Sequence, residues 1–208
     1  MSFTKLKTPP SKGGEFELIP AGVYLARCYR MIDLGTQTKD SVKYGRRDVR
    51  EILLYWELLA DDDGGEVRME DGRPFSISNR YTWSMDKKAN LRKALDAWRG
   101  TPFKDSEADG FEITNLLDKY CMIQVVHNQS GDKTYANVGT LMSTKKIAKG
   151  INELSSFSIE DPDIELYNTF PEWLKTVISE AQEWNEEEPA DRAVDEEDDT
   201  PVIVDLPF

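Results

Sequence analysis

The strongest constraint on the fold is the alternation of side chains over residues 49–59. Ile52, Leu54, Trp56 and Leu58 recur at every second position, and the positions between them are mixed in polarity. A period of two is typical of a strand that buries one face. The segment therefore predicts a strand whose apolar face, with Trp56, belongs to a core.

Four further runs are rich in β-forming residues, and turn signals bound them. They are residues 22–34, 75–84, 120–127 and 134–142, and the last two flank NQSGDK, a loop of hairpin length. Between the third and fourth strands the period changes. Residues 85–99 carry Leu91, Ala94, Leu95 and Trp98 at helical spacing and stop at Gly100, and residues 111–119 predict a short helical connector.

Five strands with a helix between the third and fourth are the layout of the OB barrel, so we expect a mainly β (α+β) fold of that type. Pro171 predicts the start of a C-terminal helix, which we expect to pack on the barrel through one apolar face. That face contains Trp173, Leu174, Val177, Ile178, Ala181 and Trp184. The expected divisions are a flexible basic arm (1–15), the OB domain (16–150), a connection with the C-terminal helix (151–187) and a disordered acidic tail (188–208).

Charge is sorted along the chain. Residues 1–150 hold 24 Lys and Arg against 21 Asp and Glu, a net charge of +3, whereas residues 151–208 hold 2 against 18, a net charge of −16. The formal charge of −13 for the whole chain therefore hides a mildly basic body joined to a strongly acidic tail.

The sequence lacks the catalytic motifs that we searched for. The chain has one histidine, His127, and neither a GxxxxGK[ST] phosphate loop nor a GxSxG nucleophile elbow. No pair among His127, Cys28 and Cys121 has zinc-ligand spacing. The acidic cluster Asp61, Asp62 and Asp63 could chelate a divalent cation, but a solvated hairpin tip explains it more simply, so we expect no metal, no cofactor and no enzymatic activity. Cys28 and Cys121 lie in apolar runs and are interpreted as buried, reduced thiols. Without an apolar span or a secretory signal, we expect a cytoplasmic protein that binds no membrane.

Basic and aromatic residues interleave in the body, as a protein that tracks phosphates and stacks on bases requires. A polar loop is expected over residues 36–48. The stretch from Lys39 to Arg50 is the most specific element, because five cations and a tyrosine fall within twelve positions. For Trp83 the sequence leaves a core position and a stacking position equally open, and most helix cations also fit an ordinary solvated face. The candidate DNA-binding residues are Arg27, Tyr29, Lys39, Lys43, Tyr44, Arg46, Arg47, Arg50, Tyr55, Arg80, Tyr81, Trp83, Lys87 and Lys88.

The chain ends in an acidic run followed by Asp205, Leu206, Pro207 and Phe208. A terminal phenylalanine presents a ring and an α-carboxylate together, which suits an apolar pocket rimmed by Arg or Lys. The tail therefore predicts a docking peptide for partner proteins. This ending resembles the C-terminal tip of bacterial single-stranded DNA-binding proteins, which recruits replication, recombination and repair enzymes and competes with DNA for the barrel.

The body is more similar to single-stranded DNA-binding proteins encoded by tailed bacteriophages. The stretches that carry the resemblance are IDLGTQ (32–37), YWEL (55–58), NLRKALDAWRG (90–100), ITNLLDKYCMIQVVHNQSGDKTYANV (113–138) and PEWLKTVISEAQEW (171–184). The resemblance implies an OB-like fold that coats single strands during phage replication and recombination in the host cytoplasm, without catalysis. The chain departs from the bacterial proteins in its added C-terminal helix and in lacking a Gly- and Gln-rich linker.

The expected partners are single-stranded DNA and, through the tail, a polymerase, helicase, primase or nuclease. The added helix favours a monomer or homodimer over the bacterial tetramer. Two other functions fit the same sequence: a strand-annealing recombination protein, and a protein-only adaptor that binds no DNA.

Overall fold

The computed structural model describes residues 17–42 and 45–186. The predicted basic arm and the predicted acidic tail with its tip lie outside the described residues, as do Lys43 and Tyr44.

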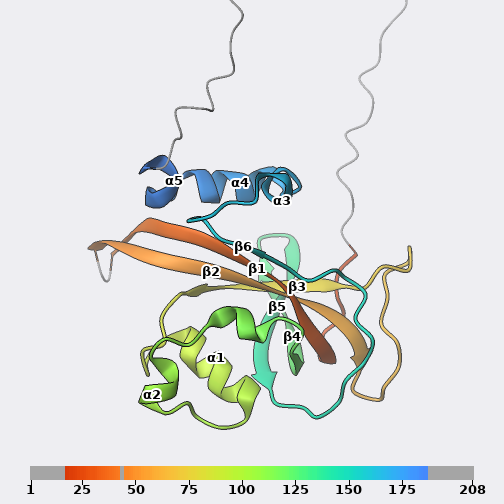
Figure 1. Cartoon of the computed structure of the whole chain (residues 1–208). Coiled ribbons are helices and arrows are strands. Elements are labelled where there is room, and N and C mark those ends of the chain that lie inside the picture. The colour runs from red at the N-terminus through yellow and green to blue at the C-terminus, as the bar shows by residue number, and fades with distance from the viewer. Residues whose placement is uncertain (1–16, 43–44, 187–208) are drawn as a thin grey trace, which may run out of the picture. The chain divides into compact units, whose positions relative to one another are not determined.

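The fold of the described residues is mainly β, and their strands form a six-stranded antiparallel sheet (Figure 1). All five predicted strands are present, and one short strand was not predicted. The strands are β1 (Gly22–Ser41), β2 (Gly45–Asp61), β3 (Ser76–Thr82), β4 (Tyr120–Ser130), β5 (Lys133–Met142) and β6 (Ser155–Phe157). Their order is β3-β2-β1-β4-β5, with β6 paired to β1. The sheet is not closed into a barrel: within the described part of the chain, β3 and β5 end this order.

The helices are short. They are α1 (Asn90–Arg99), α2 (Asp105–Ala108), the 3-10 helix η1 (Ile113–Leu116), α3 (Ile164–Asn168), α4 (Glu172–Ser179) and α5 (Gln182–Glu186). Helix α1 begins five residues later than predicted, because Asp86 forms turns in which Ala89 N donates to its carbonyl (2.8 Å) and Lys88 N to its carboxylate (2.9 Å). The predicted C-terminal helix is divided into α4 and α5, and α3 was not predicted. Leu174, Ile178 and Ala181 are buried as expected, but Trp173 is 56% exposed.

The described part of the chain forms two compact units. Residues 17–31 and 54–156 belong to the first unit, and residues 32–42, 45–53 and 157–186 belong to the second. Strands β1 and β2 contribute residues to both units. The divisions expected from the sequence within these residues were 16–150 and 151–187.

The core of the first unit is built on the predicted apolar face of β2 and on α1, which packs against β3 and β5. Trp56 and Trp98 are buried with ring centroids 5.8 Å apart, and Trp98 Nε1 donates to the Tyr120 carbonyl at 2.7 Å. Cys28 and Cys121 are buried free thiols, which confirms their interpretation. Burial raises the pKa of Cys28 to about 12.

The opposite face of β2 is also buried, which the alternation did not predict. There Glu57 is fully buried and accepts from Arg27 Nε on β1 at 2.6 Å. The Arg27 guanidinium also donates to Asp118 (3.0 Å) and to the Asn152 carbonyl (2.5 Å). Burial alone would lower the pKa of Arg27, and the hydrogen bonds to Asp118 and Glu57 outweigh it and raise this pKa.

This ion pair holds an irregular segment, residues 143–154, which we call the strap. The Glu57 carboxylate accepts from the main-chain N–H groups of Ile151 (3.2 Å) and Asn152 (2.9 Å). Gly150 lies so close to the guanidinium that a Cβ on it would come within 1.8 Å of Arg27 Cζ. Tyr120 adds a hydrogen bond from its hydroxyl to the Ala148 carbonyl at 2.8 Å. The strap is therefore fixed through its backbone.

In the second unit, the C-terminal helices pack on the ends of β1 and β2 that lie beyond the predicted strands. Glu183 accepts from Thr36 N (2.7 Å) and Thr36 Oγ1 (2.6 Å), and the amide of Gln37 donates to the Val177 carbonyl (2.9 Å). Gly35 has φ +65°, and a Cβ there would lie 2.6 Å from Ala181 Cβ. Glycine is required at this point of contact.

We predict that Arg27→Met lowers the free energy of unfolding by about 3–5 kcal/mol, because it leaves the Glu57 carboxylate buried without its cation. Urea denaturation followed by tryptophan fluorescence measures this loss.

The matched control is Arg73→Met, which removes an arginine paired with Asp71 at 2.6 Å on the surface. An exposed pair contributes at most about 1 kcal/mol. Equal losses in the two variants would contradict the assigned role of the buried pair.

Candidate nucleic-acid interface

A groove in the first unit, with a volume of about 710 Å³, gathers aromatic and cationic side chains. It lies between the residues before β1, the β2–β3 connection and the start of β5. Its lining residues are Glu17, Leu18, Ile19, Tyr29, Met69, Arg73, Pro74, Phe75, Ser76, Lys133, Thr134, Tyr135, Ala136 and Asn152. We call it the tyrosine groove.

Its inner wall is formed by buried rings. Tyr29 is buried, and its hydroxyl shares a hydrogen bond with Ser76 Oγ at 2.8 Å. Tyr55 meets it edge to face, with ring centroids 6.2 Å apart, and burial raises the pKa of Tyr55 to about 12. The structure thus brings these two predicted residues into contact, with the buried Tyr29 in the wall of the groove and the half-buried Tyr55 against it.

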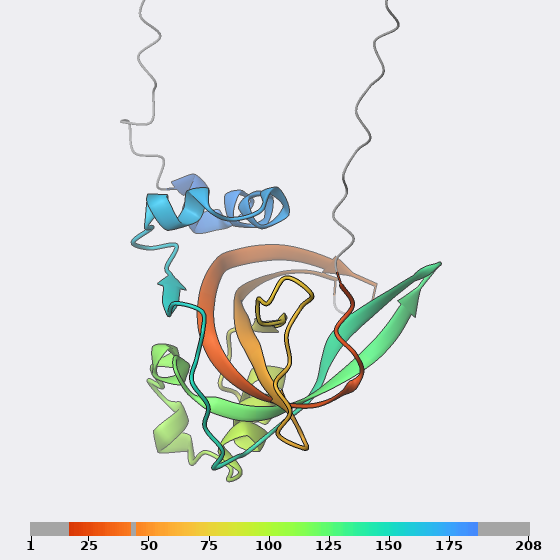
Figure 2. The same cartoon turned by 90° about the vertical axis from the view of Figure 1, so that its right-hand side faces the viewer.

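The exposed ring of the groove is Tyr135, which is 49% exposed. Lys133 is exposed two positions before it on β5, so both side chains point to the same face of the strand. Opposite them on β4 lie Ser130, paired with Lys133, and Asn128, paired with Tyr135. Figure 2 shows the turn end of this β4–β5 hairpin projecting outward.

Sequence reasoning missed Lys133 and Tyr135, although their two-residue spacing beside the Gly131 turn was a usable signal. It also missed Arg73, whose side chain reaches the groove while its Nε donates to Asp71 at 2.7 Å. Phe75 completes the set as a buried ring in the wall.

The segment from Lys39 to Arg50, predicted as a loop for DNA contact, is mostly strand, so the loop prediction was wrong. Two of its cations, Lys39 and Arg50, form ion pairs within the second unit. Lys39 pairs with the buried Glu51, and Arg50 donates to the buried Asp33 at 2.6 Å and pairs with Glu160 at 2.8 Å. The hydrogen bond with Asp33, followed by that with Glu160, raises the pKa of Arg50 in spite of partial burial. Arg46 and Arg47 are exposed on β2.

Two more predicted residues are in the interior of the first unit. Arg27 is engaged by Glu57, and Tyr81 is buried, which raises the pKa of its hydroxyl. Arg80 on β3 is exposed, and Trp83 just after β3 is half-buried.

The cations around α1 are arranged in pairs with acids of α2. Lys87 Nζ donates to Asp105 at 2.9 Å, and Arg99 donates to Glu107 at 3.0 Å. The Arg99 guanidinium, followed by the backbone N–H of Lys104, lowers the pKa of Glu107 to about 2. Arg92 is buried and donates to Asp96 and to the Met85 and Phe103 carbonyls. Lys88 is exposed.

No family model and no curated protein matches the chain. In the described part of the chain, no helix has the length and apolar character that crossing a membrane requires. Among the same residues, no group of three His, Cys, Asp or Glu side chains is placed to hold a metal ion.

We predict that Arg50→Met lowers the free energy of unfolding by about 1–3 kcal/mol, because the Asp33 carboxylate loses a buried hydrogen-bond donor. The affinity of the folded variant for oligo-dT stays unchanged. Urea denaturation and fluorescence anisotropy measure the two quantities. A loss of affinity at unchanged stability would return Arg50 to the candidate DNA-contacting residues.

Proposed function

We propose that the chain is a non-enzymatic, sequence-independent single-stranded DNA-binding protein that coats single strands in phage DNA replication and recombination. The observation that carries the proposal is the tyrosine groove, in which the exposed Tyr135 and Lys133 share one strand face and Arg73 also lines the groove. The phage setting rests on the sequence resemblance alone.

The chemistry of the groove suits a single strand. A base stacks on the ring of Tyr135, and every base offers a π face, so such a contact is tolerant of sequence. Lys133, two positions before the ring on the same strand face, meets a phosphate beside that base. Each such contact releases counterions, so binding weakens as salt rises. The buried rings of Tyr29 and Phe75 give the groove an aromatic wall.

We further propose that the sheet is an open form of the OB-like barrel. In support, α1 lies between β3 and β4 in the chain, and β3 and β5, the ends of the strand order, approach each other. A five-stranded barrel that is partly open, with a helix at this place, is the OB arrangement, whose grooves bind oligonucleotides.

The proposed role of the acidic tail rests on the sequence. Asp205, Leu206, Pro207 and Phe208 recruit replication and recombination enzymes, while the groove holds DNA. The separation of charge supports this division, because a basic body and an acidic tail favour different partners.

We predict that Tyr135→Ala lowers the affinity for oligo-dT by about 5- to 150-fold, because stacking contributes roughly 1–3 kcal/mol per base. Tyr135→Phe retains the ring and binds like the unchanged protein. Fluorescence anisotropy with labelled oligo-dT at several salt concentrations measures the affinities.

The control for charge and surface is Lys93→Gln on α1, an exposed lysine outside the groove. Full affinity in Tyr135→Ala would remove the groove from the site. If the unchanged protein ignores oligo-dT in dilute buffer, the adaptor function replaces the proposal. Annealing of complementary strands by rings or filaments would favour the recombination function.

We predict that deleting residues 195–208 leaves or tightens DNA affinity and abolishes capture of replication enzymes, because the deletion removes acids and the docking tip together. Anisotropy and pull-down assays read the two effects. Undiminished capture by the truncated chain would refute the assignment of the tail.

A further inference from the structure

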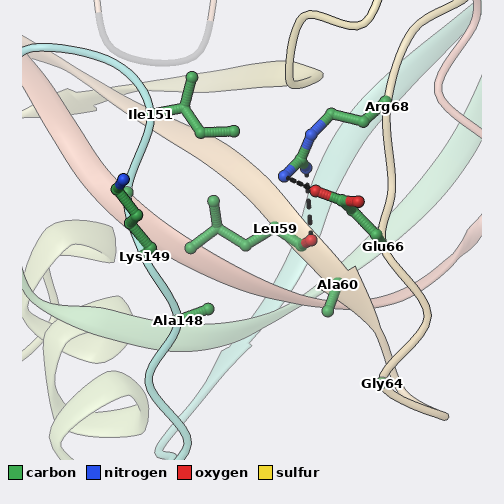
Figure 3. A pocket seen from close by; sticks show the side chains of 9 residues that line it. Leu59, Ala60, Gly64, Glu66, Arg68, Ala148, Lys149 and Ile151 are labelled. Atoms are coloured by element: carbon green, nitrogen blue, oxygen red, sulfur yellow. Dashed lines mark hydrogen bonds and ion pairs between the residues drawn. The ribbon is translucent and has the colours of Figure 1, made fainter.

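A second hollow lies beside the tyrosine groove, between the strap and the β2–β3 connection. It has a volume of about 600 Å³ and is lined by Leu59, Ala60, Gly64, Glu66, Arg68, Ala148, Lys149, Gly150 and Ile151. All of these residues belong to the first unit. We call it the strap hollow (Figure 3).

The two hollows are neighbours because the same two segments wall both of them. Arg68 and Ile151 line the strap hollow, whereas the next residues along the chain, Met69 and Asn152, line the tyrosine groove. The hollows are therefore adjacent along both segments.

Net positive charge in the strap hollow comes from the strap. On the opposite wall, Arg68 is already paired with Glu66 and donates to the Val67 carbonyl at 2.6 Å. Figure 3 shows its guanidinium directed at that carboxylate, while Lys149 and Ile151 project from the strap wall. Lys145 and Lys146 lie further along the strap and are exposed. Lys146 Nζ reaches the Asp62 carbonyl at 3.4 Å, whereas Lys149 lines the hollow and Lys145 is exposed further along the strap.

The strap also exposes apolar side chains between its lysines. Ile147 is 78% exposed and Ile151 is 48% exposed. The strap is held by backbone hydrogen bonds to Glu57, Arg27 and Tyr120 and by the side-chain amide of Asn152, which donates to Glu57 at 3.0 Å. None of these bonds engages the side chains of Ile147 and Ile151. The result is a fixed row of cations and apolar groups, which suits the phosphates and base faces of a single strand.

We infer that the strap hollow extends the DNA path, with Lys145 and Lys149 contacting phosphates of nucleotides beyond the tyrosine groove. The inference rests on the proposed function. The acidic turn at Asp62 and Asp63 repels phosphates and marks the far limit of this path.

The test compares full-length chains on oligo-dT of about 5 and about 15 nucleotides, near the two ends of the range covered by one OB fold. The strap variant K145Q/K149Q binds the short oligonucleotide like the unchanged protein. On the long one its affinity falls, and the slope of log K against log salt becomes shallower by about 1.4, at about 0.7 for each lost phosphate contact. Tyr135→Ala loses affinity on both lengths.

The matched control K93Q/K104Q removes the same charge from exposed positions outside the strap and binds both lengths normally. An unchanged affinity and salt slope of the strap variant on the long oligonucleotide would overturn the inference while the proposed function stands. If the unchanged protein binds neither length, both fall together.

Discussion

The buried ion pair between Arg27 and Glu57 is the interaction on which the first unit depends. Two charges in an apolar interior are tolerated only when their remaining donors and acceptors are satisfied. Here Asp118, the Asn152 carbonyl and the strap amides satisfy them. The pair therefore determines the path of the chain after β5, and the absence of a Cβ at Gly150 is part of the same arrangement. Both proposed DNA-contacting hollows include strap residues whose positions follow from this pair.

Much of the fold follows from the sequence because its signals are local. Alternation in β2 and helical spacing in α1 identified the core with Trp56 and Trp98, and both are buried. The hairpin extension beyond residue 34 was missed because its stabilising partners are distant in the chain. Thr36 and Gln37 were predicted to lie in a loop, yet both are in strand β1. Their side chains donate hydrogen bonds to Glu183 and to the carbonyl of Val177. The second buried face of β2 was missed for the same reason, since a glutamate marks a surface unless its cation is known.

The candidate site shows the limits of counting cations. Lys39 and Arg50 stood out as a cluster, but each is paired with a buried carboxylate that the sequence places elsewhere. Lys133 and Tyr135 were less conspicuous, and yet they lie exposed beside a groove. Density of charge in sequence does not distinguish a solvated lysine from one that neutralises a buried acid, because the difference lies in the tertiary partner. The spacing of a cation and a ring on one strand face was the better guide to the groove.

The two compact units have an unusual covalent relationship. The chain passes from the first unit to the second after Met31, returns before Leu54, and leaves again after Ser156. The 32–53 portion of the second unit is thus an insertion within the first, and its other portion follows residue 156. No single proteolytic cut separates the units, and neither can be expressed as one contiguous fragment without including part of the other. A truncation or an internal fusion at any one point between residues 17 and 186 divides at least one of the units. The two units therefore have to be expressed together as one chain.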